Sequence, residues 1–213
     1  MGLKKYSSVW EILRKGILPS LLLVMVGCAS APPSNKDNIC DIFREKRDWY
    51  DAAIATREKW GAPVHIPLAI MYQESSFKDD AQPPMEYFLW IIPIGRASDA
   101  YGYSQAKTPV WDEYVSEAGS FFSDRDDFAD AIDFIGWYMD RTHRINKVSK
   151  WNAYAQYLNY HEGQGGYRRG SYQKKPWLKK VAKKVEARAK RYGQQFWGCK
   201  EELSRNWFMR LFF

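Results

Sequence analysis

The chain has 213 residues, of which 46% are hydrophobic and 16% are aromatic, and it carries a formal net charge of +7 with a pI near 9.2. This length is sufficient for one well-filled domain and excludes two domains of ordinary size. The positive charge indicates a protein that meets anionic polymers or lipid headgroups.

Residues 1–27 have the pattern of an export signal. Basic residues precede the apolar run GILPSLLLVMV, which has the length of a signal-peptide core and is too short to span a bilayer stably. The run continues into Gly27 and Cys28 and resembles a bacterial lipobox, in which the cysteine receives lipid and becomes the mature N-terminus. The small residues 29–31 offer an alternative, an ordinary cleavage site for a secreted protein.

A lipid on Cys28 would anchor the protein to a membrane on the periplasmic side of the cell envelope. Ala29 and Ser30 resemble the residues that follow this cysteine in lipoproteins of the outer membrane. We expect residues 28–38 to form a short tether. Because an exported protein does not meet chromosomes, nucleic acid is a poor partner in spite of the high pI.

The spacing of apolar residues predicts helices in most of the remaining chain. Proline, glycine and aspartate at suitable positions mark several of the helix ends. The predicted helices cover residues 39–60, 67–74, 108–114, a segment from 126 or 127 onward, 151–160 and 176–196. No β-rich run is long enough for a central sheet. The sequence therefore predicts a single all-α domain (α-rich α+β at most) over residues 39–200, followed by a tail at 201–213.

The proline-bounded segment around residues 88–92 interrupts this helical pattern. Its sequence, FLWII, is a short apolar run that favours an extended excursion or a hairpin over a helix. One interpretation is that it packs over the core. The alternative is a functional role, as a wall of a cleft or as a loop that touches a membrane.

Two cysteines remain after Cys28 is assigned to lipid. Cys40 and Cys199 lie near the two ends of the predicted domain, and an exported protein enters an oxidising compartment. A disulfide between them would connect the terminal helices. Two buried thiols are the alternative.

The segment YQESSF, residues 72–77, contains a candidate catalytic carboxyl group. Glu74 ends an otherwise apolar predicted helix. Partial burial disfavours the charged form of a carboxyl group and raises its pKa, which is the condition for a general acid near neutral pH. Taken alone, the same pattern is also typical of a solvated helix end.

Two later segments support the catalytic interpretation. AYGYSQ (100–105) and NYHEGQGGY (159–167), together with YQESSF, resemble in order the three signatures of the lytic transglycosylase SLT family. The resemblance spans residues 67–167. It implies a lysozyme-like α-rich fold and peptidoglycan glycan strands as the substrate, with Glu74 as the catalytic acid and base.

The resemblance also implies a set of substrate-binding residues, with Tyr160 orienting Glu74 and with Tyr101, Tyr103 and Trp90 as candidates for stacking on sugars. The implied substrate-binding set is Ser75, Tyr101, Gly102, Tyr103, Gln105, Tyr160, His161 and Glu162. The sequence departs from the family pattern in three places: Tyr103-Ser104 replaces Leu-Met, His161 stands where asparagine is usual, and Glu162 where alanine is usual.

The number of carboxylates separates the possible activities. A lytic transglycosylase needs one, because the C6 hydroxyl of the substrate's N-acetylmuramic acid attacks the anomeric carbon and leaves a 1,6-anhydro end. A hydrolysing muramidase would need a second, for which Glu162, Asp79 and Asp80 are candidates. A peptidoglycan-binding lipoprotein without activity is a further alternative. We expect no metal or cofactor, since His161-Glu162 lacks the second histidine of a zinc motif.

Overall fold

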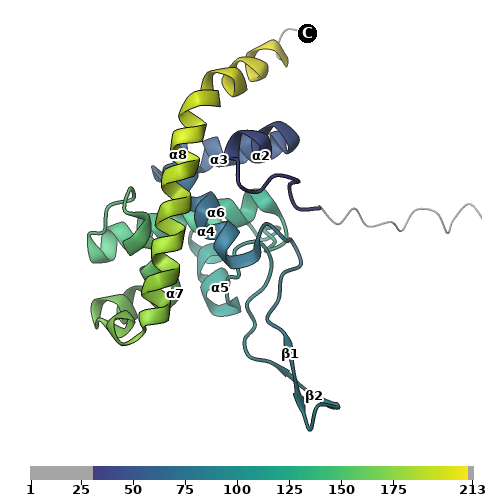
Figure 1. Cartoon of the computed structure of the whole chain (residues 1–213), viewed down its shortest axis with the longest axis vertical. Helices are drawn as coiled ribbons and strands as arrows, with labels where there is room; N and C mark the ends of the chain where they lie inside the picture. Colours follow the sequence, from purple (N-terminus) through teal and green to yellow (C-terminus); the bar gives the residue numbers. More distant parts are fainter. Residues whose placement is uncertain (1–30, 211–213) are drawn as a thin grey trace, which may run out of the picture. The chain divides into compact units, whose positions relative to one another are not determined.

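The computed structural model of the chain describes residues 31–210, with side chains as far as Ser204. The predicted signal peptide and the predicted lipidation at Cys28 lie outside these residues. The described chain is α-rich, as the sequence predicts, with a single two-stranded sheet (Figure 1). Its elements are α2 (Ile39–Glu45), α3 (Arg47–Trp60), α4 (His65–Ser75), β1 (Met85–Phe88), β2 (Ile92–Arg96), α5 (Thr108–Glu117), α6 (Phe128–Asn146), α7 (Ala153–Arg168), the 3-10 helix η1 (Ser171–Lys174) and α8 (Pro176–Arg210).

Helix α4 lies at the centre of the domain. Its residues 66–71 are all buried, so the helix has no solvent-facing side over this stretch. A helix that is apolar all round must be enclosed by other elements. Helix α4 packs against α6 and α8, and the long helix α8 also contacts α2 and α7 (Figure 1). The C-terminal end of α4, which carries Glu74, therefore emerges from the core.

The predicted first helix, residues 39–60, is wrong in one respect, because it is divided into α2 and α3. The break is at Lys46, whose φ and ψ of −117° and 80° are not helical. Contacts with the end of α8 hold the two segments in place. The Arg44 guanidinium pairs with Glu202, and Arg47 donates a hydrogen bond to the carbonyl of Leu203. The sequence contains no local signal for this break.

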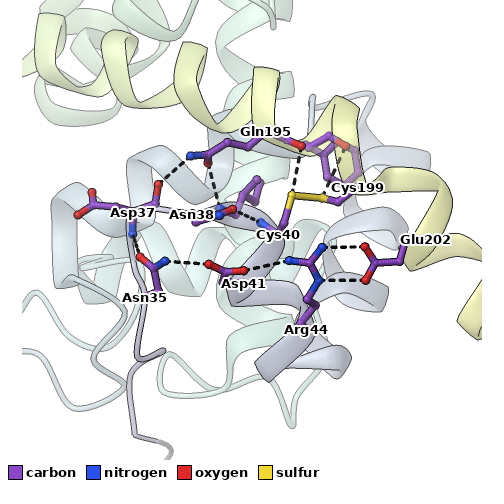
Figure 2. The surroundings of a disulfide bond; sticks show 11 residues. Asn35, Asp37, Asn38, Cys40, Asp41, Arg44, Gln195, Cys199 and Glu202 are labelled. Carbon is purple, nitrogen blue, oxygen red and sulfur yellow. Dashed lines mark hydrogen bonds and ion pairs between the residues drawn. A yellow bond between two sulfur atoms is a disulfide. The ribbon is translucent and has the colours of Figure 1, made fainter.

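The predicted disulfide between Cys40 and Cys199 is confirmed, with the two Cα atoms 6.0 Å apart (Figure 2). It connects α2 to α8 across 159 residues of sequence. Hydrogen bonds surround it: the Asn38 side chain accepts from the amide of Cys40 and caps α2, while the side-chain oxygen of Gln195 accepts from the amide of Ile39. The N- and C-terminal parts of the domain are thus joined covalently and by polar contacts.

Residues on both sides of the predicted domain, 39–200, are in contact with its helices or continue them. Residues 34–38, which the sequence assigns to the tether, contact the helices. Ser34 bonds to the carboxylate of Glu45, and Asp37 pairs with Arg188 of α8. In the predicted tail, α8 continues to Arg210, and Leu203 is buried.

The segment around residues 88–92 forms an antiparallel hairpin, β1 and β2, with Met85 opposite Arg96. The sequence predicted a hairpin as one possibility, and this is confirmed. The interpretation that it packs over the core is wrong, because all residues of both strands are exposed. Figure 1 shows the hairpin projecting away from the helices. Within the described part of the chain, no helix is long and apolar enough to cross a membrane.

Candidate active site

A tight turn ends α4 directly after Glu74. The Ser75 hydroxyl donates a hydrogen bond to the carbonyl of Met71 (3.2 Å) and accepts one from the amide of Phe77 (3.2 Å). Ser76 and Phe77 both have positive φ, 54° and 62°. The fully buried ring of Phe77 packs against Trp49 and fixes the turn. Ser75 is itself buried, so it shapes the end of the helix and is not exposed for the substrate contact that the sequence predicted.

The Glu74 carboxyl group lies in an environment that favours its neutral form. Burial raises the pKa of Glu74 from 4.5 to about 7, and a hydrogen bond from the hydroxyl of Tyr157 opposes this rise. Burial and the nearby Glu74 raise the pKa of Tyr157, which keeps this hydroxyl protonated as a donor. A carboxyl group with a pKa near 7 is present in both protonation states at neutral pH, as a group that must act first as an acid and then as a base requires.

Glu74 opens into a cavity of about 470 Å³. The walls come from the end of α4, from the segment 98–107, and from α5, α6 and α7. Four of the predicted substrate-binding residues line it: Gln105, Tyr160, His161 and Glu162. Other lining residues include Lys107, Phe134, Tyr138 and Gly163. This volume and its mixture of aromatic and polar groups suit a polar ligand such as a sugar.

Gln105 lines the cavity, and the three residues before it, 102–104, are buried in protein behind this wall. Gly102 has a φ of +71°, and a Cβ atom there would lie 2.0 Å from the carbonyl oxygen of Arg125. Tyr103 is 1% exposed, and its ring packs edge-on against Trp49 and Phe128. The prediction that Tyr103 stacks on a sugar is therefore wrong, and Gly102 allows close packing of two backbone segments.

Gln105 and Tyr160 hold this wall in place. The Gln105 side-chain amide donates to the carbonyls of Ala81 (2.7 Å) and Gly102 (3.0 Å). The Tyr160 hydroxyl donates to the carbonyl of Ser104 at 2.6 Å. The hydrogen bond to Glu74 comes from Tyr157, one turn earlier on the same face of α7. Tyr160 also lies near Glu74, because burial and then the charge of Glu74 raise the pKa of the Tyr160 hydroxyl.

The other two candidates for sugar stacking lie outside the lining of the cavity. The Tyr101 hydroxyl donates to the carboxylate of Asp126 (3.2 Å), and the Arg125 guanidinium lies 5.4 Å from the centre of the Tyr101 ring. Trp90 is in the turn of the hairpin, where its side chain is 95% exposed. Neither residue contributes to the space beside Glu74.

Glu162 is the second carboxylate in the cavity wall, and both of its oxygen atoms have hydrogen-bonding or ion-pair partners. Its Oε1 atom lies 2.7 Å from Lys175 Nζ and 3.0 Å from His161 Nδ1, and Ser171 bonds to the other oxygen. Burial would raise the pKa of Glu162, but the hydrogen bonds from Lys175, Ser171 and His161 prevail and lower it to about 2. Glu162 therefore remains an anion that positions its neighbours.

The last motif introduces a kink in α7. Gly163 has φ and ψ of 72° and 157° in the middle of the helix, and nothing lies within 4 Å of the position that a Cβ atom would take. The glycine is thus required for its backbone conformation and not for space. The kink separates Tyr157 and Tyr160 on one side from the residues that lead to η1 on the other.

Sequence reasoning missed three residues of this site: Tyr157, Ser171 and Lys175. Tyr157 could have been found, because it precedes Tyr160 by one helical turn and therefore shares its face. Ser171 and Lys175 come close to Glu162 only through the turn after α7. Among the described residues, no group of three or more histidine, cysteine, aspartate or glutamate side chains is placed to hold a metal ion.

Comparison with known families adds to this geometry. A family model described as "Transglycosylase SLT domain" matches residues 17–199 of the chain. This match covers most of the sequence and includes every residue of the cavity. No curated protein matches the chain.

Proposed function

Because the chain belongs to the transglycosylase SLT family, we propose that it is a peptidoglycan lytic transglycosylase with Glu74 as its single general acid and base. The family is one of peptidoglycan-degrading enzymes. The observation that carries the finer assignment is the Glu74 carboxyl group, which lies at the end of a buried helix with its pKa raised to about 7 and faces a cavity of about 470 Å³. Desolvation of a carboxyl group is the feature by which glycosidases of the lysozyme type keep their general acid protonated near neutral pH.

In the first step, neutral Glu74 gives its proton to the oxygen of the β-1,4 bond between N-acetylmuramic acid and N-acetylglucosamine. The bond between this oxygen and the anomeric carbon C1 breaks, and N-acetylglucosamine leaves with a free hydroxyl group. Positive charge develops on the muramic acid ring. The new Glu74 carboxylate, which accepts a hydrogen bond from Tyr157, stabilises this charge electrostatically.

In the second step, the C6 hydroxyl of the same muramic acid attacks C1. Glu74 takes the proton of this hydroxyl and returns to its neutral form. The product is a 1,6-anhydromuramic acid end, and no water is consumed. The acid and the base are the same group in successive steps, so a pKa near the working pH favours both.

The charge state of Glu162 argues against the hydrolysing alternative. Of the described residues that line the cavity, Glu74 and Glu162 are the two acids, while Asp79 and Asp80 are not in the lining. A general base that activates water must accept a proton. Glu162 is a weak base because the ion pair with Lys175 contributes to a pKa of about 2.

We also propose that the protein is anchored by lipid on Cys28 at the periplasmic side of the envelope, with the outer membrane as its place. This proposal rests on the sequence of residues 1–30. It agrees with the disulfide between Cys40 and Cys199, which is expected in an oxidising compartment.

Mass spectrometry of the muropeptides released from purified peptidoglycan tests the proposed function. We expect anhydromuramic ends from the native protein and no release by Glu74→Gln. Glu162→Gln is the matched control, since it changes the other acid of the cavity by the same substitution. It should still give anhydro ends. Reducing ends from the native protein, or full activity of Glu74→Gln, would contradict the proposal.

A further inference from the structure

The hairpin β1–β2 exposes a concentration of large apolar side chains that the proposed activity does not use. Residues 87–95, YFLWIIPIG, contain no charged side chain, and Glu86 and Arg96 bound them. The exposed fraction is 67% for Leu89, 95% for Trp90 and 81% for Ile91. Contiguous apolar surface of this kind marks a site of interaction with protein or membrane.

The hairpin is apolar on both of its faces. Successive side chains of a strand point to opposite faces, so a strand that covers a core has one buried row and one exposed row. Here every residue of β1 and of β2 is exposed. A protein partner that docks on a flat surface covers one face of a ribbon. An apolar phase that surrounds the hairpin covers both.

The turn of the hairpin has a backbone conformation that its bulky residues disfavour. Leu89 and Trp90 have φ values of 50° and 66°, a conformation in which hairpin turns prefer Asn and Gly. Bulky residues in this region of φ and ψ cost about 1–3 kcal/mol each, and such strain is found at functional sites. Two large apolar residues thus stand at the turn although its backbone conformation is unfavourable for them.

The edges of the hairpin are poorly suited to a partner that adds a strand. Pro93 in β2 has no amide hydrogen to donate, and the register shifts between Glu86 and Tyr87 in β1. Proline and irregular register both interrupt the continuous row of donors and acceptors that strand addition needs. The side chains, and not the backbone edges, are therefore the part that interacts.

We propose that the hairpin of residues 85–96 inserts its turn into a lipid bilayer. Trp90 and Tyr87 are of the types that concentrate at the boundary between headgroups and hydrocarbon, and Leu89 and Ile91 suit the hydrocarbon itself. Glu86 and Arg96, at the base of the hairpin, are the nearest charged residues on either side of the turn. Because charged side chains are costly inside a bilayer, we expect insertion to end at these two residues. The hairpin then forms a membrane contact separate from the cavity of Glu74.

The short link between Cys28 and the first helices favours a bilayer as the occupant. The described chain begins at Ala31, and residues 34–38 are bound to the helices. If Cys28 carries lipid, as proposed above, only residues 29–33 connect the bilayer to the domain, a span of about 20 Å when extended. The lipid would then keep the domain close to a bilayer. The hairpin would meet the bilayer at a high effective concentration, so that its contact strengthens the binding that the lipid provides.

A fluorescent amino acid that replaces Ile91 tests this proposal in the full-length, lipid-bearing protein. The protein is bound to vesicles of phosphatidylethanolamine and phosphatidylglycerol, and the vesicle-bound fraction is measured. Lipids with a nitroxide on the acyl chain quench probes inside the bilayer, and iodide quenches probes in water. We expect several-fold stronger quenching by the nitroxide than by iodide.

The matched control places the same fluorescent residue at Glu58, a charged and exposed position on α3 outside the hairpin. This probe should be quenched by iodide and not by the nitroxide. The proposal is overturned if the probe at position 91 behaves like the one at position 58. Protection from iodide without quenching by the nitroxide would also overturn it, since protein would then cover the hairpin. Neither outcome depends on whether Glu74 is catalytic.

Discussion

The two protonation states of Glu74 are stabilised by different neighbours. Burial favours the neutral acid, while the hydroxyl of Tyr157 donates a hydrogen bond that favours the carboxylate. The balance between them places the pKa near 7, where both states are accessible. Tyr157 therefore adjusts when Glu74 can act as an acid.

Replacing Tyr157 with phenylalanine should move the alkaline limit of activity to higher pH. Loss of the hydrogen bond removes the effect that lowers the pKa of Glu74, so the acid stays protonated at higher pH. We expect the alkaline limb of kcat/KM against pH to shift upward by up to about one unit. Tyr160→Phe is the control, because the Tyr160 hydroxyl bonds to the carbonyl of Ser104. An equal shift in both variants would contradict the assignment.

Glu74→Gln should stabilise the fold increasingly as the pH rises. The pKa of Glu74 is about 7 in the folded protein against 4.5 unfolded, so the native chain loses stability between these two values as the pH rises. Glutamine does not titrate. We expect the free energy of unfolding, measured in urea, to favour the variant by on the order of 2 kcal/mol more at pH 8 than at pH 4. A difference independent of pH would contradict the raised pKa.

Sequence reasoning at this scale identified residues near the catalytic carboxyl group but did not assign all their roles. Glu74 could be found because its segment is the first of three motifs that resemble one family in order, whereas a carboxylate at a helix end alone is also typical of a solvated surface. Ser75 and Tyr103 belong to the same motifs, yet both are buried and shape the walls. Membership in a motif does not distinguish a residue that contacts the ligand from one that packs behind it.

At the scale of elements, the loop before α5 depends on a close approach of two backbone segments. Gly102 has both a positive φ and no room for a Cβ atom, because the carbonyl of Arg125 would be 2.0 Å away. Tyr103, Ser104 and Gln105 follow directly. A change at Gly102 should therefore displace a wall of the cavity as well as destabilise the fold.

A pair of glycine variants separates these two effects. Gly102→Ala should destabilise the fold by about 3–5 kcal/mol, from backbone strain and a clash with a carbonyl oxygen together. Gly163→Ala, where a φ of 72° is combined with a ψ of 157° in open space, should cost only the strain of this glycine-favouring conformation, about 1–3 kcal/mol. Thermal unfolding of both variants measures the difference. Equal losses would show that the clash at Gly102 is relieved by small movements.

The sequence predicted the existence of most helices and located several of their beginnings. Asp127 caps α6 as one of the two expected residues, and Pro67 lies in the first turn of α4. The break at Lys46 could not be predicted, because contacts of Arg44 and Arg47 with the end of α8 hold it. The sequence offered both burial and an exposed functional loop for the hairpin segment, and it could not decide between them, since an apolar run normally indicates burial.

At the scale of the whole molecule, the disulfide joins the first helix of the domain to the last. It closes a loop of 159 residues, so in the chain-entropy model it greatly restricts the unfolded state. The Arg44–Glu202 pair beside it is about half exposed on both side chains and adds little by itself. The covalent bond is thus the main connection between these two ends.

Reduction of this disulfide should destabilise the protein by about 2–5 kcal/mol. We expect a lower melting temperature in the presence of a reductant, measured by circular dichroism. The double variant Cys40→Ser and Cys199→Ser should already melt at the lower temperature and should not respond to the reductant. A native protein that melts at the same temperature with and without reductant would contradict this expectation.

The fold class was predictable from the sequence because periodicity and three short motifs agree with one another. The boundaries of the domain were less predictable. Residues 34–38 and the continuation of α8 look like a polar tether and a tail in the sequence, and only their contacts in the fold make them part of the domain. Such contacts join residues far apart in the chain, which local patterns do not record.

The most direct test of the central claim, that Glu74 acts alone and water takes no part, is digestion of peptidoglycan in water labelled with oxygen-18. We predict products whose masses equal those formed in ordinary water, because the C6 hydroxyl of the substrate supplies the oxygen that binds C1. Products that gain one heavy oxygen at the new end would show that water attacks C1, and would contradict the mechanism proposed for this protein.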